Sequence, residues 1–216
     1  MRNFRAALRW VRQNPLATFG GAAALVLLLG KARKGSYTSA TYKPYSPEAR
    51  DLLVDAARGA GLPESWGDAN ETHYIMSKES AGRVGIPNYT WTQRKDASRW
   101  PEVWNILKQL NDYVYKGNPS EKEREARWAT FKKTVYPVPK STATGLGQLL
   151  LSNVRAFYPD GVTGIGDPYN EAVGFLRYID SRYGSPQVAY SMYGKTGSYT
   201  HARTGKVQTK GFQEGY

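Results

Sequence analysis

Apolar residues recur three and four positions apart along most of the chain beyond residue 46, which is the spacing of amphipathic helices. The first such stripe follows the capping signal Ser46-Pro47-Glu48 and ends at Gly59 and Gly61. Six more helices are predicted: near 69–78, from Trp100 to Val114, from Pro119 to near Phe131, over 145–157, from Asp167 to Tyr183, and after Ser185. No region sustains strict alternation, although Ile86–Thr92 has room for a small hairpin. The expected fold class is therefore mainly α.

A different pattern fills the N-terminal segment. Residues 15–30 read PLATFGGAAALVLLLG, an uncharged run with basic residues on both sides. A membrane-spanning helix usually needs about 20 apolar residues, but interfacial Trp10 and Val11 and snorkelling arginines lengthen this run. A cleaved signal peptide fits less well, because the basic cluster 31–34 stands where a cleavage region is small and neutral. We therefore favour one uncleaved transmembrane helix, and place a buried soluble helix third.

These patterns divide the chain of 216 residues into three parts. Residues 1–34 form a basic N-terminus with the transmembrane anchor, and residues 35–46, which are polar and contain glycine, serine and proline, are expected to be a linker. Residues 47–216 have the length of one globular domain. Four arginines before residue 15 favour an N-terminus on the cytoplasmic side, with the domain on the other side of the membrane.

Composition narrows the chemistry. The chain has no cysteine and two histidines, so thiolate chemistry and a three-histidine zinc site are excluded, and no metal or cofactor is expected. The net charge of +12 favours polyanionic partners, but it does not distinguish nucleic acid, anionic lipid and acidic cell wall. No helix-turn-helix, zinc-finger or RNA-binding signature is present, and so no specific nucleic-acid partner is expected.

Three short stretches in a fixed order carry the strongest functional signal. They are Lys78-Glu79-Ser80 at the end of an apolar helix, the segment 141–148 (STATGLGQ), and the segment 188–193 (VAYSMY), which follows the helix that begins at Asp167-Pro168. This order resembles the lytic transglycosylases of the soluble-transglycosylase, goose-lysozyme-like superfamily. The resemblance covers about 47–199 and implies a lysozyme-like α domain. The segments 182–186 and 211–216 look like those of phage-encoded members.

The resemblance implies that Glu79 is the catalytic acid and base. Cleavage of a glycosidic bond needs a proton on the leaving oxygen, and a carboxyl supplies it near neutral pH only if burial raises its pKa. Tyr74, Ile75 and Met76 precede Glu79 and offer an apolar wall. In such enzymes the same glutamate then accepts a proton from the C6 hydroxyl of the sugar, which leaves a 1,6-anhydromuramyl end without a second carboxylate.

Further substrate-binding roles follow from the same resemblance. Ser80 is expected to orient the Glu79 carboxyl, with local backbone bonding as an equal alternative. Gly145 is expected to allow close approach of the backbone to the substrate, with loop flexibility as the plainer alternative. Leu146, also expected at the substrate site, would complete the apolar wall around Glu79 together with Tyr190. Gln148 is expected to line the cleft and bond an N-acetyl group or a sugar hydroxyl, unless its side chain only faces water. The usual Tyr-Asn motif is replaced by 190–194 (YSMYG), so either Tyr190 or Tyr193 is expected to position the muramyl acetamide.

The main departure from the superfamily is an insertion at about 88–139, which contains two predicted helices and four tryptophans. It is expected to form a helical hairpin along one wall of the cleft, and to hold glycan, dock a partner or simply add stability. The segment 120–133 within it is charged on most faces and is expected to be solvent-exposed.

The sequence thus predicts a membrane-anchored peptidoglycan lytic transglycosylase, held by residues 15–30 in a virion membrane or bacterial inner membrane and facing the cell wall. The expected partners are peptidoglycan strands and other virion or envelope proteins, and the expected role is local wall opening during phage genome entry. Two alternatives stay open: a hydrolysing muramidase of the same fold, and a non-catalytic glycan-binding virion protein.

Overall fold

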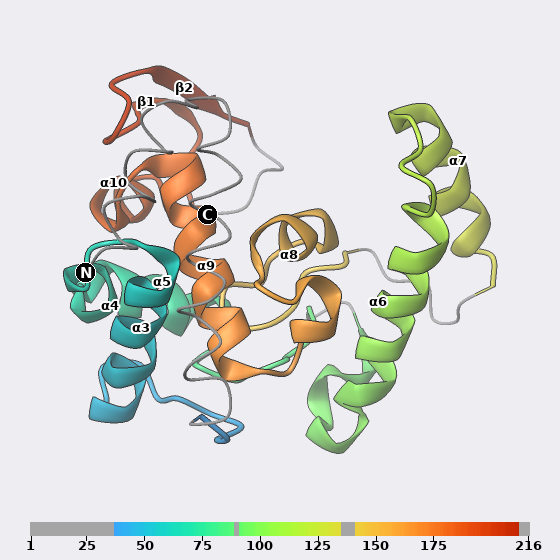
Figure 1. The fold of residues 1–216 in the computed structure, drawn as a ribbon, viewed down its shortest axis with the longest axis horizontal. Coiled ribbons are helices and arrows are strands. Elements are labelled where there is room, and N and C mark those ends of the chain that lie inside the picture. The colour runs from blue at the N-terminus through green and yellow to red at the C-terminus, as the bar shows by residue number, and fades with distance from the viewer. Residues whose placement is uncertain (1–36, 89–90, 135–140, 212–216) are drawn as a thin grey trace, which may run out of the picture.

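The computed structural model describes residues 37–88, 91–134 and 141–211, and this part of the chain is mainly helical, as predicted (Figure 1). The α-helices are α3 (Pro47–Ala60), α4 (Ser65–Asp68), α5 (Asn70–Glu79), α6 (Trp100–Val114), α7 (Glu121–Phe131), α8 (Leu151–Phe157), α9 (Pro168–Tyr183) and α10 (Pro186–Ser191). The 3₁₀ helices are η2 (Thr92–Lys95), η3 (Ala97–Arg99) and η4 (Gly161–Gly164). The strands β1 (Gly197–Thr200) and β2 (Val207–Lys210) pair antiparallel.

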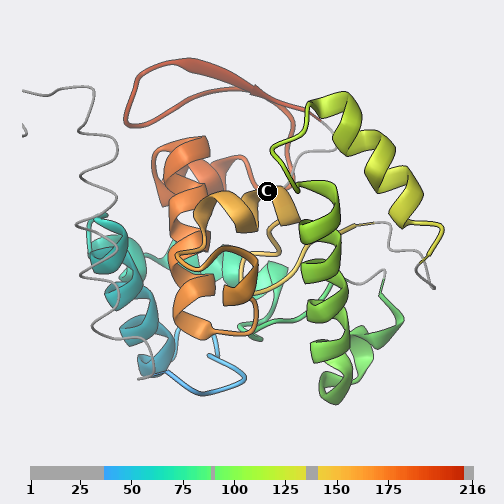
Figure 2. The same ribbon diagram turned by 45° about the vertical axis from the view of Figure 1, so that its right-hand side comes forward.

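Helix α9 forms the centre of the core and packs against α3, α8 and α10 (Figures 1 and 2). Of its 16 residues 12 are buried, which is the pattern of a helix that has neighbours all round. Its start is defined locally: the Asp167 carboxylate accepts the N–H of Asn170, and Pro168 occupies the first turn. Gly184 ends it in the left-handed conformation.

Helix α3 packs directly on α9 and follows the sequence prediction closely. The Ser46 hydroxyl caps its first turn, and Gly61 ends it with φ of 73°. The predicted apolar stripe is fully buried, and a Cβ at Gly59 would clash with the hydroxyl of Tyr169 on α9. This close approach brings α3 against the central helix, while α4 packs on α3 and α5 packs on α10.

Residues 37–46 are not a separate linker, in contrast to the prediction. Thr41 forms an isolated antiparallel bridge with Arg83, the N–H of Tyr42 donates to the carbonyl of Gly82, and the ring of Tyr42 is buried. The polar composition of the segment hid this packing, because its anchor is one tyrosine and backbone pairing rather than an apolar run. The segment is part of the domain from Tyr37 onward.

Helices α6 and α7 form the predicted helical hairpin at one edge of the molecule (Figure 1). The apolar face of α6 is buried, whereas α7 has no buried residue, in line with its expected exposure. Trp104 fastens α6 to the core: its indole N–H donates to the carbonyl of Gly85 at 2.8 Å, and its ring fills the space that a Cβ at Gly85 or Gly166 would need.

Two predicted elements differ in the structure. The helix expected over 145–157 begins only at Leu151, because Thr144 pairs with Leu149 across a tight turn that carries Gly145 to Gln148. The hairpin considered within Ile86–Thr92 is instead an isolated bridge between Pro87 and Thr144. The β1–β2 hairpin was not predicted, since its strands are short and mostly exposed.

The predicted membrane anchor at residues 15–30 lies outside the described residues. Within 37–88, 91–134 and 141–211, no helix has the length and apolar character needed to span a bilayer. The anchor therefore stays a prediction from the sequence.

Candidate functional site

Glu79 is the last residue of α5, and its partly buried side chain faces α10 and the turn that follows it. Burial raises the pKa of its carboxyl from the ordinary 4.5 to about 7. A hydrogen bond with Tyr193 and the positive charges of Lys210 and Arg94 favour the ionised form, but they do not outweigh the loss of hydration. This carboxyl therefore exchanges a proton close to neutral pH.

Three tyrosines cluster where α5 meets α10, and one of them, Tyr193, hydrogen-bonds this carboxyl. The Tyr74 ring packs edge-on against Tyr190, with centroids 4.9 Å apart, and against Tyr193 at 5.9 Å. Tyr193 hydrogen-bonds Glu79, and both burial and the neighbouring carboxylate raise the pKa of its phenol, so the hydroxyl is a hydrogen donor. Tyr190 is 45% exposed, and its ring packs against Tyr74, which in turn packs against Tyr193. Of the two predicted tyrosines, Tyr193 is thus the one that touches Glu79.

Two cations reach Glu79 from distant parts of the chain. Lys210 on β2 is 3% exposed and its ammonium donates to the carbonyl of Met192 at 2.9 Å. Arg94 on η2, inside the insertion, donates to the carbonyl of Pro87 at 2.8 Å. Neither residue was predicted, because only the folded chain brings the insertion and the C-terminal hairpin to the end of α5.

The Ser80 hydroxyl bonds the local backbone, which is one of the two roles expected for it beside orienting the Glu79 carboxyl. Its side chain is buried, with 1% exposure, and its hydroxyl bonds the carbonyl of Met76 at 3.2 Å and the N–H of Gly82 at 3.0 Å. These bonds close α5 and start the turn to Arg83, whose guanidinium donates to the Ser80 carbonyl. Ser80 therefore fixes the backbone on which Glu79 stands.

The predicted residues of the 145–148 segment lie together in one tight turn. The Gln148 amide nitrogen donates to the carbonyls of Ile86 at 2.8 Å and Gly145 at 3.1 Å, and its backbone has φ of 46°. Leu146 is fully buried in the core. Ile86 precedes Pro87, whose carbonyl accepts from Arg94, and the charge of Arg94 lowers the pKa of Glu79. The 145–148 turn is therefore connected indirectly to the surroundings of Glu79.

Glu171 is a second carboxyl that the sequence did not single out. It is fully buried on α9 and accepts the backbone N–H groups of Gly85, Leu146 and Gly166 at 2.8 to 3.0 Å. Burial raises its pKa to about 7, although these bonds favour the charged form. Its oxygens are occupied by backbone donors from three loops, so Glu171 holds the 145–148 turn and the Gly85 turn onto the central helix.

Gly145 has no room for a side chain. Its φ is 78°, and a Cβ there would lie 2.6 Å from the hydroxyl of Tyr158 and 2.8 Å from the carboxyl of Glu171. The requirement for glycine thus comes from the protein interior, and not from the substrate approach or the loop flexibility between which the sequence left the choice open.

Both histidine side chains bond backbone groups of the protein. His73 is fully buried, accepts the N–H of Tyr45 through Nδ1 and has its pKa lowered by burial. His201 contacts the carbonyl of Asp180 and the N–H of Thr204. No group of three or more His, Cys, Asp or Glu residues suited to a metal ion occurs in the part of the chain that the structure describes.

The tryptophans of the insertion divide into two groups. Trp91, Trp100 and Trp104 each donate their indole N–H to a backbone carbonyl and pack inward. Trp128 on α7 is only partly buried and lines a cavity between the hairpin and the 141–152 segment. Most of this aromatic content therefore serves packing.

Comparison with known proteins yields no matching family model, no matching curated protein and no matching solved structure.

Proposed function

We propose that this chain is a peptidoglycan lytic transglycosylase that cleaves the β-1,4 bond between N-acetylmuramic acid and N-acetylglucosamine. The observation that carries the proposal is the Glu79 carboxyl, whose pKa of about 7 results from its burial at the end of α5. A group with this pKa is populated in both protonation states near neutral pH, which general acid and general base steps require. The motif order of the sequence adds the substrate class.

The reaction needs one carboxyl group in two successive roles. Protonated Glu79 donates its proton to the leaving glycosidic oxygen while the C1–O bond breaks. The resulting carboxylate then accepts the proton of the C6 hydroxyl as O6 bonds to C1, which gives the 1,6-anhydro end and restores the acid. The described groups that act on the pKa of Glu79 are Tyr193, Lys210 and Arg94, and none of them is a second carboxylate of the kind hydrolases use.

The surroundings of Glu79 also suit an acidic polymer. Arg94 and Lys210 place positive charge beside the carboxyl, and the net charge of the chain is +12. Tyr190, exposed beside Tyr74, offers a ring on which a sugar can stack. In this proposal the described fold is a lysozyme-like domain, and the α6–α7 hairpin is an insertion whose Arg94 borders the site.

The predicted anchor at residues 15–30 would hold the enzyme at a membrane. A transglycosylase held in a virion membrane or bacterial inner membrane, with its domain toward the periplasm, opens the wall locally, as phage genome entry requires. This setting rests on the sequence alone.

The test is digestion of purified sacculi by the wild-type chain and by Glu79→Gln, with zymography and mass spectrometry of the products. The proposal predicts anhydromuramyl ends from the wild type and a loss of at least about 100-fold in the variant, the scale of a missing general acid. Reducing muramyl ends would indicate a muramidase instead. Full clearing by a folded Glu79→Gln variant would exclude Glu79 as the catalytic acid.

A further inference from the structure

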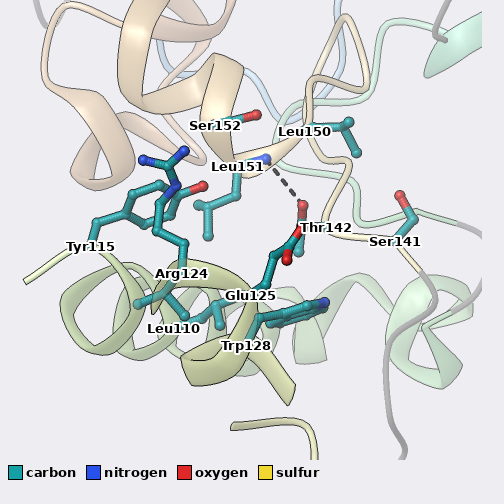
Figure 3. Close-up of a pocket in the computed structure, with 11 residues that line it drawn as sticks. Leu110, Tyr115, Arg124, Glu125, Trp128, Ser141, Thr142, Leu150, Leu151 and Ser152 are labelled. Carbon is teal, nitrogen blue, oxygen red and sulfur yellow. Dashed lines mark hydrogen bonds between the residues drawn. The ribbon is translucent and has the colours of Figure 1, made fainter. Parts of the chain in front are cut away.

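A cavity of about 730 Å³ lies between the α6–α7 hairpin and residues 141–152, apart from the groups that surround Glu79 (Figure 3). Its walls include Tyr115, Arg124, Glu125, Trp128, Thr142 and Leu151. This volume falls within the roughly 300 to 1,000 Å³ of small-molecule sites in proteins. The proposed reaction uses none of these residues.

Two opposite charges face this cavity from α7. The side chains of Arg124 and Glu125 point from the helix toward Thr142 and Leu151 (Figure 3). The Arg124 guanidinium donates to the carbonyl of Pro119 at 3.2 Å and lies 6.0 Å from the Tyr115 ring, and it forms no ion pair with a described residue. Glu125 likewise pairs with none of the described cations. A ligand with both a carboxylate and an amino group would complement this pair.

The remaining walls suit a short peptide. Trp128 and Leu151 give apolar surface, whereas Ser141, Thr142 and Ser152 bring hydroxyl groups that hydrogen-bond amides. A neutral glycan would leave both charges of α7 without partners, and an anionic lipid or a nucleic acid would pair with Arg124 but leave Glu125 without a cationic partner. A peptide with free carboxylate and amino groups meets all three features.

A single loop, 142–151, connects the cavity to the turn that carries Gly145 and Gln148. The N–H of Leu151 donates to the Thr142 hydroxyl at 3.1 Å, and Thr144 pairs with Leu149, so 142–151 is a narrow loop. Its base lines the cavity and its tip carries Gly145 and Gln148. Gln148 at the tip donates to the carbonyl of Ile86, and the next residue, Pro87, accepts from Arg94, whose charge lowers the pKa of Glu79. The loop thus links the cavity to the proposed catalytic carboxyl through the insertion.

We propose that the α6–α7 cavity binds the peptide side chains of peptidoglycan, with Arg124 on a peptide carboxylate and Glu125 on its free amino group. This inference rests on the proposed function and gives the insertion a role in substrate selection. The enzyme would then prefer glycan strands that carry peptides over strands that have been stripped of them.

The test measures binding and turnover separately. Isothermal titration of the full chain with a free peptidoglycan tetrapeptide is expected to show binding in wild type and in Glu79→Gln, and a loss of about tenfold in Arg124→Ala. Lys122→Ala, which removes the same charge from an exposed position of the same helix, is the matched control and should bind as wild type does. Thermal melts establish that each variant is folded.

Turnover is then compared on intact sacculi and on glycan strands freed of peptide by an amidase. Arg124→Ala is expected to lose about tenfold on sacculi and nothing on stripped strands, while Lys122→Ala matches wild type on both. If wild type cuts both substrates and the tetrapeptide does not bind, or Arg124→Ala behaves as wild type, the peptide site is refuted and the proposed function stands. If wild type cuts neither substrate, the proposed function fails and this inference fails with it.

Discussion

The hydroxyl of Tyr193 hydrogen-bonds the carboxyl of Glu79, and thereby joins the turn after α10 to the end of α5. This contact brings together two of the three motif segments of the sequence. A phenol that donates to a carboxylate stabilises the charged form, while burial of the same carboxylate disfavours it. The balance between these two effects sets the pH at which Glu79 exchanges its proton.

Tyr193→Phe removes the donor and keeps the ring. The pKa of Glu79 should rise by about one unit, since a hydrogen bond to a charged group contributes about 1.5 kcal/mol. The high-pH limb of kcat/KM on peptidoglycan should move upward by the same amount. Tyr190→Phe, on the ring that packs edge-on against Tyr74, is the control and should leave the limb in place. Equal shifts in both variants would contradict a specific role for Tyr193.

Lys210→Met removes a buried cation whose charge lowers the pKa of Glu79. Loss of that charge should raise the pKa and move the high-pH limb of kcat/KM upward. The variant should also lose about 1 to 2 kcal/mol of stability, because the carbonyl of Met192 loses its donor. Lys206→Met, at an exposed position before β2, should change neither quantity. A limb that moves downward would show that Lys210 does not act on Glu79.

Glu171→Gln tests whether the buried Glu171 carboxyl holds the Gly85, Leu146 and Gly166 backbone in place. The variant would turn an amide N–H₂ toward backbone donors that now bond a carboxylate oxygen, so we expect a loss of about 2 to 4 kcal/mol in the free energy of unfolding. The wild-type pKa is raised from 4.5 to about 7, so the native state keeps a proton that the unfolded chain releases. That contribution is complete below pH 4.5 and disappears as the pH rises through 7.

Urea unfolding from pH 4 to 8 measures this slope, with Glu79→Gln as the comparison, because Glu79 titrates over the same window. Each variant should remove the contribution of its own carboxyl to the change of unfolding free energy with pH. An unchanged slope in Glu171→Gln would refute the raised pKa.

Gly145→Ala should be destabilising for two reasons, its φ of 78° and the clash with Tyr158 and Glu171. Gly117→Ala separates them, since Gly117 has φ of 75° with no atom near its absent Cβ. We expect a loss of about 1 kcal/mol for Gly117→Ala and about 3 kcal/mol or more for Gly145→Ala in thermal or urea unfolding. Equal losses would show that the interior around Gly145 is not tightly packed.

The elements with local signals could be predicted from the sequence. Helices α3, α9 and α10 each begin with a Ser or Asp cap followed by proline, and the structure places all three where this pattern predicts. The helix predicted over 145–157 is wrong at its start, where a tight turn follows Thr144 and the helix begins only at Leu151. The conformation of this turn is set by its hydrogen bonds to Glu171, which lies 25 residues away from Leu146 in the sequence.

The candidate site could be predicted only in part, for the same reason. Glu79 and the pair Tyr190 and Tyr193 follow from short motifs and the resemblance they carry, and in the structure Tyr193 hydrogen-bonds Glu79. Arg94 and Lys210 lie in the insertion and the C-terminal hairpin, where neither has a local signature. Their effect on Glu79 depends on tertiary packing that periodicity does not encode.

The central claim is that burial keeps the Glu79 carboxyl protonated close to neutral pH. A carbon-13 NMR titration of the side-chain carboxyls, with the Glu79 signal assigned by its absence from Glu79→Gln, measures this directly. We predict a midpoint at about pH 7. A midpoint near the ordinary 4.5 would contradict it, because a carboxyl ionised at that pH has no proton to give the leaving oxygen at neutrality.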